Sequence, residues 1–184
     1  MSARPRPGQI VFLHLLVEFL FRLTFGVATA MAILPAKWVT SGFFRVHLWV
    51  LLGVQTLAAL GAARVLAILT ADESGASLSS LTVYRGRFYL AVAAAVASYV
   101  GAVIWMYERR GLGKAVIGLI AVLTGVASCW PVVAQRMPPV ALMLADRVTS
   151  GLVVGFVTTA MLLGHWYLNT PTMKLETANA VSLA

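Results

Sequence analysis

Two histidines within apolar stretches of this chain could ligate a haem iron. His47 lies near the start of the stretch 43–68, and His165 lies near the end of the stretch 143–168. If both stretches cross a bilayer as helices, the two imidazoles lie in the same leaflet at similar depth. A haem b between two helices needs one imidazole from each. The pattern therefore predicts one haem b whose iron is bound by these two histidines.

The residues around the histidines fit this interpretation. Arg45 lies on the same side of the membrane as His47 and could pair with a haem propionate. Gly61 and Gly151 each lie fourteen residues from a histidine, on the same helix face, and predict room for the macrocycle. The alternative is that the glycines serve close helix packing and the histidines bond lipid headgroups.

A second constellation lies in the first apolar stretch. His14, Glu18 and Arg22 recur at four-residue spacing and so form one polar stripe on a helix. Each ionisable residue in a membrane costs about 2.5–3.5 kcal/mol and therefore faces protein or water. The functional interpretation is a proton path or quinone headgroup site, with Glu18 as proton carrier, His14 as relay and Arg22 as electrostatic partner. The structural alternative is an ion pair between Glu18 and Arg22.

Five long apolar stretches must position these residues. The chain is 60% hydrophobic and 11% charged, which is incompatible with a water-soluble surface. Each stretch is long enough to cross the hydrocarbon core as a helix. The sequence therefore predicts a single transmembrane domain over residues 1–184, an all-α integral membrane protein built as an antiparallel bundle of five transmembrane helices with short loops. The expected helices cover residues 10–34, 43–68, 88–107, 114–134 and 143–168.

We call the side of the membrane that holds the N-terminus side A and the opposite side B. Residues 69–87 form the longest expected loop, on side A, and Asp146 with Arg147 should mark the start of the fifth helix there. Aromatic residues should form an interfacial belt on side B: Trp38, Trp49, Trp105, Tyr107, Trp166 and Tyr167. Arginines before the first stretch place side A in the cytoplasm.

Composition also excludes several functions. The net charge of +8 is spread over helix ends on both sides, where basic residues meet anionic lipid headgroups, so no nucleic-acid partner is expected. The chain has one cysteine, Cys129, and therefore no intrachain disulfide. No nucleotide-binding loop or nucleophile–base motif occurs. We expect a non-catalytic subunit of an oxidoreductase complex rather than an isolated enzyme.

Together, a proton or quinone site toward side A and a haem toward side B are typical of a membrane subunit of a respiratory or photosynthetic electron-transfer complex. Such a subunit links the quinone pool to a partner subunit, in a bacterial cytoplasmic membrane, and contacts lipids and other membrane subunits. Two alternatives stay open. One is a cofactor-free accessory or scaffold subunit of a larger membrane complex, and the other is a small proton-coupled transporter that uses the stripe of His14, Glu18 and Arg22.

Overall fold

The computed structural model describes residues 7–71, 77–136 and 138–169, and this part of the chain is helical apart from its connections. Each of the five helices is long and apolar enough to cross a membrane, which confirms the predicted all-α membrane bundle. The helices are α1 (Pro7–Ile33), α2 (Ser41–Ala71), α3 (Leu78–Met106), α4 (Arg110–Ala134) and α5 (Val140–Asn169).

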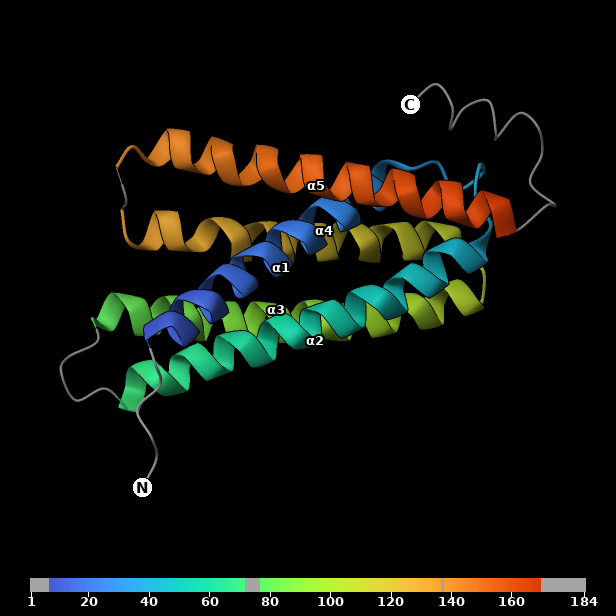
Figure 1. Cartoon of the computed structure of the whole chain (residues 1–184). Helices are drawn as coiled ribbons and strands as arrows, with labels where there is room; N and C mark the ends of the chain where they lie inside the picture. The colour runs from blue at the N-terminus through green and yellow to red at the C-terminus, as the bar shows by residue number, and fades with distance from the viewer. Residues whose placement is uncertain (1–6, 72–76, 137, 170–184) are drawn as a thin grey trace.

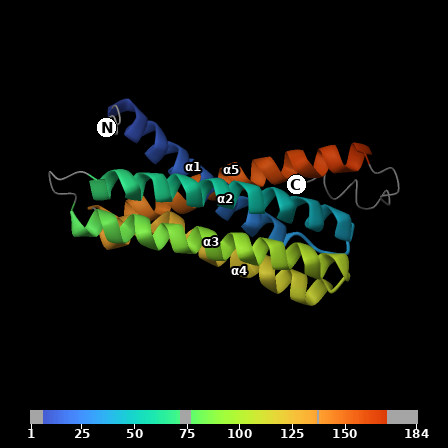
Figure 2. The ribbon, with the colours of Figure 1, turned by 90° about the horizontal axis from the view of Figure 1, so that it is seen from below.

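Helix α1 lies at the centre of the bundle and runs obliquely between its neighbours (Figure 1). It packs against α2, α4 and α5, while α2 pairs with α3 and α3 pairs with α4. The view turned by 90° shows the same oblique course of α1 across the other helices (Figure 2). As the first and fifth helices of an up-and-down bundle, α1 and α5 run in the same direction, from side A to side B.

The start of α3 differs from the prediction. We expected a helix from residue 88, but α3 begins at Leu78 because Ser77 caps it and its side chain accepts the Ser80 N–H at 3.3 Å. The predicted loop over 69–87 is therefore wrong at both ends, since α2 also continues to Ala71; residues 72–76 lie outside the described residues. As a consequence, Arg87 lies more than two turns inside a membrane helix.

Aromatic and aliphatic side chains form the core of the half near side B. The Phe44 and Trp105 rings stack with centroids 4.3 Å apart, and both side chains are buried. The predicted aromatic belt is therefore wrong for Trp105, which points into the bundle, whereas Trp38 and Trp49 are exposed as the belt requires.

A lysine closes the end of α1 in this same half. Pro35 follows the helix and cannot continue its hydrogen bonding, so the last carbonyl groups of α1 lack helical donors. Lys114 of α4 donates to the carbonyls of Met31 at 2.8 Å and Ala32 at 2.7 Å, and also to that of Leu34. One ammonium group thus replaces the donors that a continuing helix would have provided.

Helices α1 and α5 cross in backbone contact. A Cβ atom at Gly26 would overlap the carbonyl group of Gly151, and one at Gly155 would overlap the backbone of Gly26. Small residues allow this approach, as they do in many membrane helix pairs. The crossing fixes which α5 side chains lie beside the polar stripe of α1.

Candidate functional site

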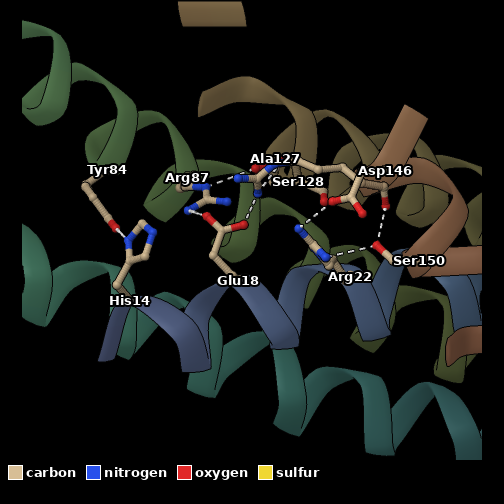
Figure 3. A network of polar contacts seen from close by, with 10 residues as sticks. His14, Glu18, Arg22, Tyr84, Arg87, Ala127, Ser128, Asp146 and Ser150 are labelled. Atoms are coloured by element: carbon tan, nitrogen blue, oxygen red, sulfur yellow. Dashed lines mark hydrogen bonds and ion pairs between the residues drawn. The ribbon is translucent and has the colours of Figure 1, made fainter. Parts of the chain in front are cut away.

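Glu18 lies at the centre of a buried charged cluster (Figure 3). It is eight residues from Ile10, where the first span begins, and so lies roughly 12 Å along the helix from that end. Its Oε1 lies 2.6 Å from Arg87 Nη1, and its Oε2 accepts a hydrogen bond from Arg147 Nη1. We call Glu18, Arg87 and Arg147 the Glu18 cluster; it joins α1, α3 and α5.

The expected ion pair between Glu18 and Arg22 is therefore wrong. Although the two residues are neighbours on α1, the crossing with α5 and the extended α3 supply two closer guanidinium groups for Glu18. Arg22 instead donates to Ser150 Oγ at 3.0 Å and to Asp146 Oδ2 at 3.3 Å. This second pair lies at the edge of the bundle, where the Arg22 and Asp146 side chains are 27% and 64% exposed.

Arg87 is the most deeply buried member of the cluster, with no exposed surface. Its Nε donates to the carbonyl of Ala127 at 3.0 Å. That carbonyl is four residues before Pro131, which lies inside α4 and has no N–H to donate back to it. The proline thus creates a carbonyl without its helical partner, and Arg87 fills the position.

Arg147 reaches the cluster from the first turns of α5. Its Nη1 also donates to the Ser128 carbonyl at 3.3 Å, one residue after the carbonyl that Arg87 uses. The prediction that Asp146 and Arg147 merely mark the start of a helix is wrong, because consecutive residues on a helix point about 100° apart. Asp146 points to the edge of the bundle and Arg147 points inward.

His14 is connected to the cluster through a residue that sequence reasoning did not identify. Its Nδ1 forms a hydrogen bond with the Tyr84 hydroxyl group. The Tyr84 ring is buried, and the Arg87 guanidinium carbon lies 5.9 Å from its centroid. His14 itself is exposed, so His14, Tyr84 and Arg87 lead from the outside of α1 toward Glu18 (Figure 3).

The cluster has more positive charge and more donors than it can match internally. One carboxylate faces two guanidinium groups, which leaves one surplus positive charge. Four buried donor atoms in and beside the cluster make no hydrogen bond among the described residues: Arg87 Nη1, which faces Glu18 only as an ion pair, and Arg87 Nη2, Ser128 Oγ and Arg22 Nε. Buried donors are nearly always satisfied in folded proteins, so this site is suited to a ligand that accepts hydrogen bonds.

The two histidines predicted to bind haem both lie near side B but are not brought face to face. His47 is buried, its Nδ1 lies 2.7 Å from the Phe43 carbonyl, and its ring packs against Phe43 and Trp166 at centroid distances of 4.1 and 6.2 Å. His165 is exposed. Arg45 is exposed beside His47. Trp166, the neighbour of His165 on α5, therefore packs edge-on against the His47 ring.

The glycines expected to leave room for a haem serve helix packing instead. A Cβ at Gly61 would lie 2.7 Å from Val17, and one at Gly151 would lie 2.9 Å from Phe25, and both of these side chains belong to α1. Because α1 runs between α2 and α5, it covers the two glycine faces. The prediction that these glycines leave room for a haem is therefore wrong, because α1 lies at the centre of the bundle.

Sequence reasoning thus found Glu18, assigned Arg147 only to a helix start, and missed Arg87 and Tyr84. The missed signal was Pro131 within an apolar span, since an internal proline leaves a carbonyl that a buried donor must satisfy. No group of three potential metal-ligating side chains occurs in the described ranges. Searches against protein-family models, curated proteins and solved structures gave no match for this chain.

Proposed function

We propose that this protein is a membrane subunit of a respiratory or photosynthetic electron-transfer complex and that the Glu18 cluster receives the headgroup of a quinone. The observation that carries the proposal is Arg87, which is fully buried yet has an Nη2 without an acceptor among the described residues. A quinone reaches such a depth through lipid, and its carbonyl oxygens accept hydrogen bonds from groups of this kind.

In this proposal each residue of the cluster has a separate task. Arg87 and Ser128 donate hydrogen bonds to the headgroup, and Glu18 positions Arg87 and Arg147 rather than carrying protons, because both of its oxygens are held by guanidinium groups. His14 and Tyr84 carry protons between side A and the site. The bound quinone would supply the electron-carrying chemistry, and partner subunits would supply the donor or acceptor. The bacterial cytoplasmic membrane, with side A in the cytoplasm, is the proposed location.

Quinone retention tests this proposal. The full chain is purified from membranes in a mild detergent, supplemented with ubiquinone or menaquinone, washed, extracted and analysed for quinone. We expect about one quinone per wild-type chain and a loss of about tenfold or more in affinity for Arg87→Gln. Arg110→Gln, which changes an exposed arginine on side B, is the control. A wild-type protein that retains neither quinone contradicts the proposal and favours the cofactor-free accessory subunit.

A haem at His47 is a second candidate, favoured by one observation. The Phe43 carbonyl fixes the Nδ1 side of the ring, and ligating histidines are commonly held by such a bond at the nitrogen that does not bind metal. Binding would require Trp166 to move from the His47 ring and His165 to turn inward. A reduced-minus-oxidised spectrum that shows a b-type haem, and loses it in both His47→Ala and His165→Ala, would support this candidate; a colourless, iron-free protein would remove it.

A further inference from the structure

We infer that the Glu18 cluster binds one monovalent inorganic anion, such as chloride, inside the membrane bundle. This inference goes beyond the proposed function and does not require that a quinone binds. Both ligands would use the same donors, so they would bind in turn. An anion would neutralise the surplus positive charge of the cluster.

The charges of the surrounding residues lead to this conclusion. Glu18 and Arg147 have side chains that are each 11% exposed, and the Arg87 side chain is 0% exposed. The cluster therefore holds one surplus positive charge away from water, which is energetically costly inside a membrane. Asp146 does not remove the surplus, because it already pairs with Arg22 and is 64% exposed. One bound anion would neutralise the whole network.

The hydrogen-bond donors give an independent argument. Arg87 has five N–H donors, of which Nε bonds Ala127 and Nη1 faces Glu18. Its Nη2 makes no hydrogen bond of 3.5 Å or less among the described residues, although the Tyr84 side chain interacts with the same guanidinium group. The hydroxyl of Ser128, whose own carbonyl accepts from Arg147, makes none either. A halide accepts several such bonds at once and needs no particular orientation. The unused donors and the surplus charge thus both favour an anion that accepts hydrogen bonds.

Bromide provides a direct probe for this site. The full chain, free of quinone, is placed in phosphatidylcholine nanodiscs, and gluconate is replaced stepwise by bromide at constant ionic strength while the midpoint of thermal unfolding is followed. We expect a saturable rise in the midpoint. Anomalous diffraction from crystals grown in bromide should show one ion within hydrogen-bond distance of Arg87 Nη2.

Variants that change the count of charges separate an anion site from a merely structural network. Arg87→Gln removes the surplus and should weaken bromide binding by about tenfold or more, whereas Glu18→Gln raises the surplus to two and should tighten it. The double variant Glu18→Gln with Arg87→Gln restores a surplus of one but still lacks the Arg87 donors, so it should bind bromide more tightly than Arg87→Gln and more weakly than the wild type. Arg110→Gln should bind bromide as the wild type does.

The inference is overturned if the wild type shows no saturable bromide effect, or if the anomalous peak lies away from Arg87. It is also overturned if the double variant binds bromide as weakly as Arg87→Gln, because damage to the fold would then explain both. Should a variant fail to fold, the diffraction experiment on the wild type still decides. Loss of quinone binding with intact bromide binding would reject only the proposed function.

Discussion

Lys114 and Arg87 lie in opposite halves of the bundle and both donate hydrogen bonds to carbonyl groups. Only Lys114 has an acceptor for each of its N–H donors. Both are cations that donate to carbonyl groups without helical partners: Lys114 at the end of α1, and Arg87 at the carbonyl freed by Pro131. An ammonium group has three N–H donors, and Lys114 uses them on three carbonyls. Arg87 bonds Ala127 and faces Glu18, and its Nη2 makes no hydrogen bond among the described residues.

The difference separates a structural cation from the proposed binding site. Near side B the remaining core is aromatic and aliphatic, and the lysine closes a helix end. Near side A the arginine belongs to a charged cluster with one surplus charge. A cation that donates to carbonyls without helical partners is therefore not by itself a sign of function; the proposal rests on the unused donors of a fully buried cation.

The largest effect should come from removing the carboxylate near side A. Glu18→Leu leaves two buried guanidinium groups without their counter-charge, and loss of one partner in a buried ion pair costs about 3–5 kcal/mol. Unfolding in mixed micelles of dodecylmaltoside and sodium dodecyl sulfate, followed by circular dichroism, measures the loss. Phe19→Leu, at the exposed neighbour, is the control. Equal stability of Glu18→Leu and wild type would mean that the cluster is not formed.

Substitutions at the crossing of α1 and α5 should lower the free energy of unfolding more than substitutions on the outer helix surface do. Gly26→Ala places a methyl group into the backbone of α5 and should cost about 1–3 kcal/mol through overpacking. Gly164→Ala, which meets no atom within 4 Å, should leave the unfolding free energy nearly unchanged. If the two variants are equally stable, α1 and α5 do not approach as closely as described.

Removal of the Lys114 ammonium group should lower the free energy of unfolding less than removal of the Glu18 carboxylate does. Lys114→Met leaves three carbonyls near side B without donors, and we expect a loss of about 1–2 kcal/mol because each hydrogen bond contributes modestly and water reaches this end. The same micelle unfolding assay applies, with the exposed Lys37→Met as control. A loss as large as that of Glu18→Leu would remove the distinction drawn between the two halves.

The smallest effect belongs to the exposed edge of the polar network. Arg22→Gln breaks an ion pair whose acidic partner is 64% exposed, and such pairs contribute less than about 1 kcal/mol. The cost should also fall as salt is added, since salt screens exposed charges. A salt-independent loss of several kcal/mol would show that Arg22 belongs to the inner cluster.

The sequence was sufficient for the five spans and their order, because hydropathy and the cost of an unpaired backbone in lipid leave few alternatives. It also identified the polar stripe of α1. It could not identify the partners of Glu18. A span chosen for its apolar residues excludes arginines, so Arg87 was assigned to a loop, although Ser77 provides a capping residue ten positions earlier.

The histidine pair shows the opposite limit of sequence reasoning. Depth along two helices was inferred from residue counts, and both His47 and His165 do lie near side B. Direction around a helix depends on which neighbour packs against it, and α1 is the neighbour that covers the glycine faces of α2 and α5. Residue spacing within α2 and α5 carries no information about a third helix between them.

The position of Arg147 on α5, which follows α1 to α4 in the chain, has a consequence for biogenesis. Helices α1 to α4 are made before α5, so Glu18 and Arg87 can form a neutral pair before Arg147 is present. Arg147 of α5 adds the surplus positive charge to this pair. The close contact of Gly26 with Gly155 determines where α5 packs against α1. The proposed binding site can therefore form only after α5 has been made, and a chain cut before α5 would lack it.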